Sequence, residues 1–498
     1  MNPKSKPKKY KKFFQFALLS LVAIGLTVMT SSDLKRKLRL HRYYRKKLRD
    51  RRLDKYQEST SEVVLPYNQE DIVSLAWGLQ RAHPMILVFD GTGFKSYFLG
   101  HFKFQWRYVN LIPLMVHALE SKYPHRFQTG QPVFQMVFTI SDFLATECEN
   151  APHHCPINAF YPPFVSYSTV SKNSKVFPTA KAFPNPPFSG CISNWKLKGD
   201  TQCKWQKVDR NIPFEDLENK IIWRGSDFCF LPNIYNFQEN NNQLQRVFSK
   251  YSLATRSDRK IMDELMNRYD QLTPRWKAVV LSLKERILED RNATNAWIDA
   301  LFSGSANGEV HQLLNERGLL VSEKDSMDSV AMSKYKYQID LGGGGGTTWE
   351  GTLTKLLMPG VLFHHVTPTK DWFYDLMEPY VHYIPVDLDL KNLRSQYEWA
   401  EANPEKVKMI AETSTKFAEY LLSLDYLEKV YTDLFVDYFG NLIEAYQPEG
   451  RSWEESLDLY KNMGVTLRKV AQCDESLCSV EWDHGFTHQI SKNLPRNS

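Results

Sequence analysis

The sequence lacks the short patterns that mark several common binding sites. Its seven cysteines form no C-x-x-C pair, so zinc patterns built on that pair are absent. The five glycines at 342–346 are not followed by G-K-[ST], and Thr347 stands where G-x-G-x-x-G needs its third glycine. These absences exclude a P-loop and the dinucleotide fingerprint at this run.

Cysteine is also scarce and odd in number, so at least one of the seven stays unpaired within the chain. Five cysteines lie between residues 148 and 229, and two lie near the C-terminus. This crowding suits a few short-range disulfides in an oxidising compartment. The last residues, LPRNS, contain no retention tetrapeptide.

Charge is absent from residues 13–30, FFQFALLSLVAIGLTVMT. A helix of this length crosses a thin bilayer, so we expect a transmembrane signal anchor; a cleaved signal peptide is the alternative. Basic residues flank the run on both sides, so they do not decide its orientation. The glycosylation sequon at Asn292 and the cysteines favour a luminal body, which gives a single-pass type II protein with a cytoplasmic tail at 1–12.

The chain has a net charge of +6, and much of its excess of basic residues lies before residue 56. A basic tract beside a membrane is more simply a lipid-facing or topogenic signal than a nucleic-acid site, and we expect no nucleic-acid partner. Residues 31–60 have no apolar periodicity and predict a basic stem. The remaining chain, in a protein of 498 residues with 42% hydrophobic residues, is long enough to bury two medium-sized domains.

The segment around the glycine run predicts a strand, a loop and a helix start. Alternate residues from Tyr335 to Leu341 are apolar, the pattern of a half-buried strand. Thr347 lies three residues before Glu350, as in a capping box. Glycines let backbone N–H groups approach a ligand, and a helix start favours anions, so the run is a candidate diphosphate cradle. A flexible turn is the alternative.

Two earlier apolar runs also predict strands. MILVF at 85–89 is followed by D-G-T-G and an aromatic stretch, which favours a hairpin over a phosphate site. FQMVFTI at 134–140 delivers Ser141 and Asp142 to its carboxyl end, the edge of an α/β sheet where ligands bind. Taken alone, an Asp at such a place is more often a cap or turn residue than a general base.

Residues 334–390 resemble glycosyltransferase family 90, which contains protein O-glucosyl- and O-xylosyltransferases and capsule xylosyltransferases. The KYKY strand, the glycine loop, a helix with K-L-L, V-L-F, D-W-F-Y-D-L-M-E-P and H-Y-I-P-V occur in the family's order. The resemblance implies an α/β fold of the GT-B type, with two Rossmann-like domains facing a cleft and the donor held mainly by the second. It extends over residues 133–420 and is continuous only from 334 to 390.

The resemblance also implies roles for single residues. Asp142 becomes the catalytic base that takes the proton of the acceptor hydroxyl, although Phe143 and Leu144 replace the family's aromatic-Pro pair. IIWRGSDFC at 221–229 resembles a strand end at which Arg224 and Ser226 meet the diphosphate. PPFVSYST at 162–169 resembles a segment beside the donor, and its candidate cleft-lining residues are Phe164, Ser166 and Tyr167.

The glycine loop departs from that of the protein O-glucosyltransferases, which place Ser-x-Arg after it. This chain has Thr347, Thr348 and Trp349 there, so no cation replaces that Arg, and algal and bacterial members with Ser-x-Trp or Thr-x-Trp look closer. Trp349 either packs on the nucleotide or supports the helix. The candidate donor-binding residues are Arg224, Ser226, Gly344, Gly345, Gly346, Thr347, Thr348 and Trp349.

The expected organisation continues after the stem with an acceptor-side domain at 61–215, a donor-binding domain at 216–400, helices packing back at 401–450 and a tail at 451–498. The D-L-D at 387–389 resembles a loop of this family, so we expect neither a metal nor another cofactor. The implied function is inverting transfer of glucose or xylose from a UDP-sugar to a protein or glycan hydroxyl in the Golgi or endoplasmic reticulum. A catalytically silent glycan-binding or scaffold relative, or another UDP-sugar-using enzyme, is the alternative.

Overall fold

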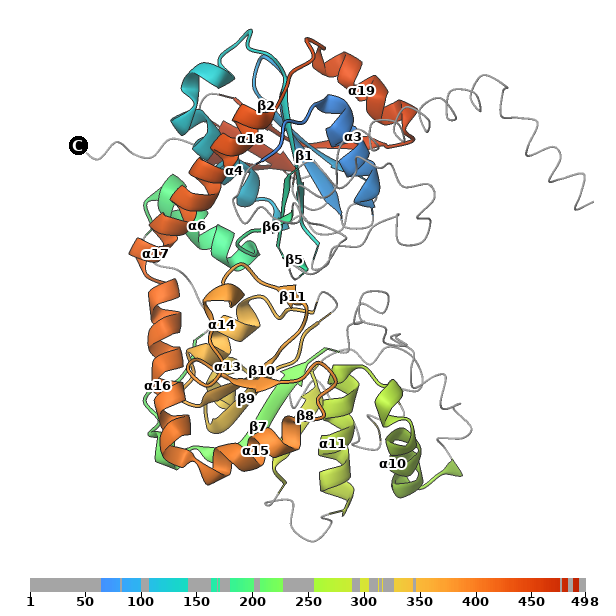
Figure 1. The fold of residues 1–498 in the computed structure, drawn as a ribbon, viewed down its shortest axis with the longest axis vertical. Helices are drawn as coiled ribbons and strands as arrows, with labels where there is room; N and C mark the ends of the chain where they lie inside the picture. Colours follow the sequence, from blue (N-terminus) through green and yellow to red (C-terminus); the bar gives the residue numbers. More distant parts are fainter. Residues whose placement is uncertain are drawn as a thin grey trace, which may run out of the picture. The chain divides into compact units, whose positions relative to one another are not determined.

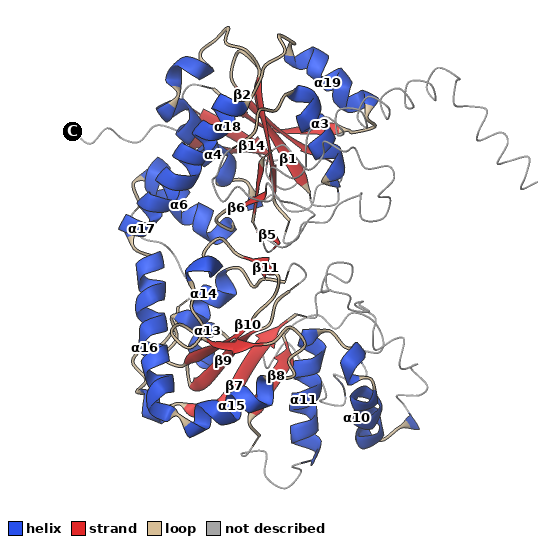
Figure 2. Ribbon diagram, viewed as in Figure 1, coloured by secondary structure: helices blue, strands red, loops and turns tan. Residues whose placement is uncertain are grey.

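A computed structural model of the protein describes residues 64–80, 83–99, 107–141, 163–167, 169–170, 180–200, 207–226, 255–288, 296–303, 312, 316, 327–343, 346–474, 477–481 and 487–491 (Figure 1). Their strands form an eight-stranded sheet, a five-stranded sheet and a two-stranded ribbon, with helices packed against the sheets (Figure 2). This mixture of elements agrees with the α/β class expected from the sequence.

The five-stranded sheet is parallel throughout and is formed by the middle of the chain. Its strands are β7 (Glu218–Gly225), β8 (Ile298–Phe302), β9 (Tyr335–Asp340), β10 (Val361–His365) and β12 (Ile384–Val386). The spatial order is β12-β10-β9-β7-β8, and every neighbouring pair is parallel. Numbered along the chain, this is the doubly wound order 2-1-3-4-5, in which the strand order reverses between the first and third strands. In this protein those strands are β7 and β9.

Helices cover both faces of the parallel sheet. α11 (Pro274–Leu288) packs against β8, α14 (Glu350–Leu356) against β9 and β10, and α16 (Pro404–Leu421) against β10. Leu362 belongs to the core cluster that contains Leu353 and Leu356, whereas its neighbours Val361 and Phe363 belong to a second cluster with α11. Because adjacent residues of a strand point to opposite faces, β10 is buried on both.

β9 differs in this respect from the half-buried strand that its alternating pattern predicted. Its polar residues Gln338 and Asp340 are as buried as its apolar ones. The reason is α14, whose Thr352 hydroxyl donates a hydrogen bond of 2.7 Å to Asp340 Oδ2. The polar side of the strand therefore faces a helix and not solvent.

The eight-stranded sheet is mixed and joins both ends of the described chain. Its order is β15-β14-β13-β2-β1-β3-β4-β6, with β3–β4 and β4–β6 parallel and the other pairs antiparallel. The sequence led us to expect a second Rossmann-like domain, whose sheet would be parallel, and this mixed sheet differs from that expectation. The strands are β1 (Pro84–Phe89), β2 (Phe94–Leu99), β3 (Phe134–Thr139), β4 (Phe164–Ser166), β6 (Ala180–Ala182), β13 (Leu467–Cys473), β14 (Leu477–Glu481) and β15 (Thr487–Ser491).

The predicted hairpin at residues 85–98 is confirmed. β1 and β2 are antiparallel, with Phe89 opposite Phe94. The turn between them is held by Asp90, whose Oδ1 accepts hydrogen bonds from the Thr92 and Gly93 amides at 2.9 and 3.1 Å. Asp90 is therefore occupied with the turn and with an ion pair to Lys95.

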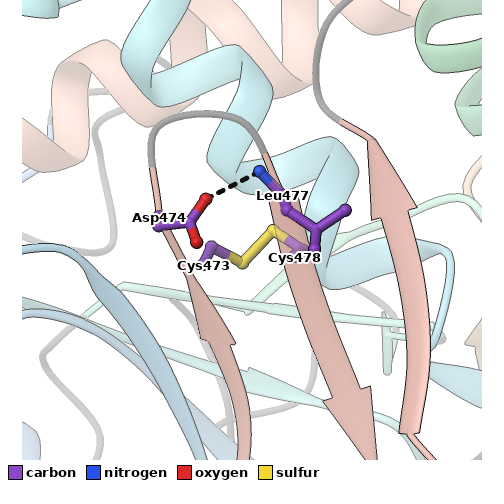
Figure 3. Close-up of a disulfide and its surroundings, with 4 residues drawn as sticks. All are labelled: Cys473, Asp474, Leu477 and Cys478. Carbon is purple, nitrogen blue, oxygen red and sulfur yellow. Dashed lines mark hydrogen bonds between the residues drawn. A yellow bond between two sulfur atoms is a disulfide. The ribbon is translucent and has the colours of Figure 1, made fainter.

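Residues 451–498 were expected as a tail, but their described part contains one helix and three strands of the eight-stranded sheet. α19 (Trp453–Asn462) is tied to it by hydrogen bonds of Trp453 Nε1 to the Tyr97 hydroxyl and of the Tyr460 hydroxyl to Gln135 Oε1. A disulfide between Cys473 and Cys478 joins β13 to β14 across their turn (Figure 3). The C-terminal segment is thus part of the eight-stranded sheet.

The expected fold included a transmembrane helix, and this expectation has to be corrected. Within the described residues no helix is both long and apolar enough to span a membrane. α16, for example, has 18 residues but is amphipathic, burying Val407 and Ile410 while exposing Glu405 and Lys406. The predicted span at 13–30, with the tail at 1–12 and the stem at 31–60, lies outside the described residues.

The remaining elements connect and cover the sheets. The ribbon pairs β5 with β11 in antiparallel fashion, and α17, a π-helical segment and α18 follow α16 along the chain (Figure 1). These elements are α3 (Gln69–Gly78), α4 (Leu111–Lys122), η4 (Pro124–Phe127), β5 (Thr169–Val170), α6 (Pro186–Lys198), η6 (Phe214–Asp216), α10 (Asp258–Asn267), η7 (Tyr269–Gln271), α13 (Ser329–Met332), β11 (Thr369–Lys370), η10 (Tyr374–Leu376), α15 (Leu393–Ala402), α17 (Leu424–Val430), the π-helix η11 (Tyr431–Tyr438) and α18 (Phe439–Ala445).

Candidate functional site

Two segments singled out from the sequence meet at the point where the strand order of the parallel sheet reverses. β7 ends in Trp223-Arg224-Gly225, followed by Ser226, and β9 ends at Asp340, followed by the glycine loop. The two strands are hydrogen-bonded neighbours and run in the same direction. Their carboxyl ends therefore share one edge of the sheet, the place where doubly wound folds bind ligands.

The glycine loop folds back on itself. The Gly343 amide donates to Thr347 O at 3.0 Å, and the Gly346 amide donates to Gly343 O at 2.9 Å. A Cβ at Gly342 would lie 2.5 Å from Gly346 O, and Gly346 has a φ of +84°. Glycine is therefore required at both ends of the described loop, the first for space and the second for conformation. Gly344 and Gly345 lie outside the described residues.

The first peptide unit of the loop is held from both sides. Its carbonyl, Leu341 O, accepts a hydrogen bond of 3.1 Å from Arg275 Nη2, and its amide, Gly342 N–H, donates to His365 Nδ1 at 3.2 Å. Arg275 comes from α11 and His365 from the end of β10. At the other end of the loop, the Thr367 hydroxyl donates to Gly346 O at 2.8 Å.

His365 is held as a neutral ring. Burial lowers the pKa of His365 to about 4, and the charge of Arg275 acts in the same direction. Its Nε2 lies 3.0 Å from Leu388 O, a carbonyl that can only accept, so the ring proton is assigned to Nε2. Nδ1 is then the acceptor that the Gly342 amide requires.

The helix after the loop begins later than the sequence predicted. α14 starts at Glu350 with Trp349 as its N-cap, and no side chain caps it. The Thr347 capping box is therefore not formed, because the chain still turns at Trp349, where φ is +53°. The Thr347 hydroxyl is instead buried without a hydrogen-bond partner among the described residues.

Trp349 packs against two residues that are distant from it in the sequence, Tyr167 and Arg107. Its ring is T-shaped to that of Tyr167, with centroids 5.6 Å apart, and the Arg107 guanidinium lies 4.7 Å from its centroid. Arg107 Nη1 also donates to Ile140 O at 2.8 Å, and its own carbonyl accepts from the Tyr167 hydroxyl. Tyr167 is thus joined to the end of the glycine loop.

The other two residues expected to line a cleft are core residues of β4. Phe164 and Ser166 are fully buried, and the Ser166 hydroxyl accepts a hydrogen bond of 2.9 Å from Thr139. Their strand is internal to the eight-stranded sheet, between β3 and β6. Tyr167, which follows the strand, contacts Trp349 of the glycine-loop segment.

Arg224 is paired with an acidic residue on the neighbouring strand. Its Nη2 lies 2.9 Å from Asp299 Oδ2, and Nη1 donates to the carbonyls of Trp223 and Asp299. The Arg224 side chain is only 5% exposed. Its Nε is a buried donor with no hydrogen-bond partner among the described residues. Arg224 therefore combines a satisfied charge with one unsatisfied N–H group.

A buried polar cluster lies beneath the loop, centred on Asp340. This carboxylate accepts from His364 Nδ1 at 2.7 Å, from Thr352 at 2.7 Å and from the His365 amide at 2.9 Å. Burial alone would raise the pKa of Asp340, but the charge of His364 and these hydrogen bonds hold it below its usual value. Thr352 also lies 2.6 Å from the Thr348 hydroxyl, which links the cluster to the loop.

A buried lysine, Lys355, lies on α14, the helix that also carries Thr352. Lys355 Nζ donates to Gly351 O at 3.3 Å, and burial lowers the pKa of its ammonium group while the charge of Asp340 opposes that shift. No sequence motif pointed to Arg275, Asp340 or Lys355. His365 belongs to the H-H pair that ends β10, and this pair is the feature by which the sequence could have indicated it.

Several predicted site residues are outside the described part of the chain. These are Asp142, the two central glycines of the loop and Asn292. β3 ends at Thr139, three residues before Asp142, and Ser141 is buried. Asp142 itself lies outside the described residues, so its role as the base stays a prediction.

The D-L-D segment is held by local contacts. Asp389 Oδ2 lies 2.7 Å from Lys391 Nζ, and the Asp387 amide donates to Asn392 Oδ1 at 2.8 Å. Over the residues that the structure describes, no group of three or more His, Cys, Asp or Glu side chains could hold a metal ion.

Comparison with known proteins places part of this region in a family. Residues 306–463 match the model of Glycosyl transferase family 90. Protein O-glucosyltransferase 2 of Danio rerio is 33% identical over 111 residues, which are 21% of this chain and 21% of that protein. Protein O-glucosyltransferase 1 of Homo sapiens is 30% identical over 106 residues, 21% of this chain and 26% of that protein.

A viral relative of unknown activity is similar over a shorter stretch. Uncharacterized protein 179R of Invertebrate iridescent virus 6 is 37% identical over 78 residues, 15% of this chain and 7% of that protein. The chain therefore covers about a quarter or less of the length of these three relatives. The family match contains β9, the glycine loop, α14 and His365. The chain therefore contains a segment, residues 306–463, that matches glycosyl transferase family 90.

Proposed function

We propose that this protein is an inverting glycosyltransferase that moves glucose or xylose from a UDP-sugar to a hydroxyl group of a protein or glycan. The observation that carries the proposal is the position of the W-R-G-S segment and the glycine loop, at the adjacent carboxyl ends of β7 and β9. Ligands of doubly wound sheets bind at this edge. The names of the relatives support glucose as donor sugar and protein as acceptor.

The donor diphosphate would lie between these two segments. Arg224 Nε and the Thr347 hydroxyl are buried there without partners among the described residues, and unsatisfied buried donors are unfavourable. Phosphate oxygens would accept from both. Ser226 and backbone amides of the loop other than that of Gly346, which donates to Gly343 O, would complete the set. N–H groups would then carry much of the binding that a side-chain cation provides elsewhere.

The reaction would be a single displacement. Asp142 would accept the proton of the acceptor hydroxyl as its oxygen attacks the anomeric carbon, and the bond from that carbon to the diphosphate oxygen would break. The negative charge developing on UDP would be stabilised by the donors at β7 and β9. Since these groups handle the leaving charge and Asp389 is paired with Lys391, we propose transfer without a metal or another cofactor.

A luminal location is part of the proposal. Cys473 and Cys478 form a disulfide, and Cys191 is also disulfide-bonded. Structural disulfides persist in oxidising compartments such as the lumen of the endoplasmic reticulum or Golgi. A protein or glycan acceptor for O-linked sugar would be available there.

A catalytically silent relative is the second candidate. The observations in its favour are the pairing of Arg224 with Asp299 and the presence of Trp349 where the protein O-glucosyltransferases have an arginine. Such a protein would bind UDP or a glycan without turning a donor over. It would serve as a luminal binding or scaffold protein.

Release of UDP by the purified full chain tests the proposal. The protein is incubated with UDP-glucose and with UDP-xylose, and the Asp142→Asn variant is the comparison. We expect turnover by the wild type and a loss of about 100-fold or more in the variant. Equal turnover would remove Asp142 as the base, and UDP binding without turnover of either donor would favour the silent relative.

A further inference from the structure

Arg275 contacts both segments of the proposed donor site. Its Nη1 donates to Ser226 O at 2.7 Å, its Nη2 to Leu341 O at 3.1 Å, and its Nε to Gly342 O at 3.1 Å. The first carbonyl follows β7 and the other two follow β9. One guanidinium group therefore spans the point of strand-order reversal.

The position of the guanidinium is defined by packing as well. Its central carbon lies 5.6 Å from the ring centroid of Trp223, on β7. Arg275 is the second residue of α11, a helix that packs against β8. Arg275 thus connects three strands of the sheet through a side chain with a fixed planar arrangement of donors.

The contacts of Arg275 determine how the glycine loop leaves β9. Arg275 holds the carbonyl of the Leu341–Gly342 peptide, and His365 holds its amide from the other side. The next carbonyl, Gly342 O, also accepts from Arg275. Because Arg275 holds two successive carbonyls, those of Leu341 and Gly342, it fixes the direction of the backbone at the start of the loop.

Gly343 fits this arrangement sterically. A Cβ at this residue would lie 3.0 Å from Arg275 Nη2 and 3.5 Å from Thr347 O, and its φ is not in the left-handed region. The guanidinium is therefore the tightest contact that a side chain at 343 would meet. The absence of a side chain at Gly343 therefore leaves room for the Arg275 guanidinium.

We propose that Arg275 is a positioning residue of the donor site, which sets Ser226 and the glycine-loop amides at the spacing required by one nucleoside diphosphate. The inference rests on the proposed function, since it assumes that this edge of the sheet binds UDP. Arg275 acts through the backbone of the two segments and need not touch the ligand. Lysine cannot replace it, because one ammonium group cannot reach three carbonyls in this planar arrangement.

The first test compares binding of UDP and of uridine by calorimetry in Arg275→Lys and the wild type. We expect UDP affinity to fall by about 10-fold or more, in line with the loss of one or two hydrogen bonds at the site, and uridine affinity to change by less than about twofold. Arg268→Lys, a surface arginine paired with Glu264, is the matched control and should leave both affinities unchanged. Melting temperatures of both variants show whether they are folded.

The second test uses the pair with Gly343. Gly343→Ala should weaken UDP binding in the wild type and have a smaller effect in Arg275→Ala, because the clash is with the guanidinium. Such non-additivity supports the inference. Additive effects, equal losses for UDP and uridine, or unchanged UDP affinity in Arg275→Lys would overturn it while the proposed function stands. A wild-type protein that does not bind UDP overturns the proposed function and this inference together.

Discussion

Arg224 Nη2 lies 2.9 Å from Asp299 Oδ2, across the parallel pair β7–β8. The cation of the W-R-G-S segment is therefore already partnered by a carboxylate, and that carboxylate would compete with a diphosphate. This relationship distinguishes the site from one with a free arginine. It also gives a direct way to change the charge at the site without touching Arg224.

Asp299→Asn should lower stability and tighten UDP binding. The variant leaves the nearly buried Arg224 without its charged partner, which costs about 1–3 kcal/mol of unfolding free energy. The same change removes the competing anion. Denaturant unfolding and UDP titration measure the two effects. Weaker UDP binding at unchanged stability would contradict this reading of the pair.

The buried cluster under the loop predicts a larger loss of stability. Asp340→Asn replaces a carboxylate that accepts from His364, Thr352 and the His365 amide. Breaking such a buried charged network should reduce the unfolding free energy by about 3 kcal/mol. Asp375→Asn, which removes an exposed ion pair with Lys370, is the control and should cost less than about 1 kcal/mol. Similar losses in the two variants would show that the cluster is not a stabilising centre.

Asp371 predicts a pH dependence of stability. Burial raises the pKa of its carboxyl to about 7, so the folded state keeps a proton that the unfolded state releases near pH 4. Stability should therefore fall as pH rises from about 4 to 7, by about 1.4 kcal/mol for each pH unit at most.

Asp371→Asn removes this dependence. Its stability relative to the wild type should increase from pH 5 to pH 8, since the amide cannot ionise and can still accept from the Trp372 amide. Unfolding free energies measured across this range for both proteins decide the matter. Parallel curves would mean that Asp371 titrates normally.

Local patterns predicted those parts of the fold that local sequence determines. The D-G turn gave the β1–β2 hairpin, and the alternating residues of β9 gave a strand followed by a glycine loop. The burial of Gln338 and Asp340 did not follow, because it depends on α14 packing over the strand. The Thr347 capping box failed because positive φ values at Gly346 and Trp349 delay the helix start.

Contacts between distant segments could not be predicted. Arg275 meets Leu341 across 66 residues, and only the order of β7, β8 and β9 brings α11 to the loop. β13 was missed for another reason: most of its residues are polar or partly exposed, so its sequence carries little strand pattern. The W-R-G-S segment and the glycine loop were found separately, but their position at one sheet edge follows from topology alone.

Both proposals require UDP to bind at the carboxyl ends of β7 and β9. Hydrogen–deuterium exchange of the full chain, with and without saturating UDP, tests this binding, because it reports on the backbone amides of each segment. We expect slower exchange in peptides covering residues 224–226 and 342–349. Slower exchange confined to other segments, or no change at these two, would contradict it.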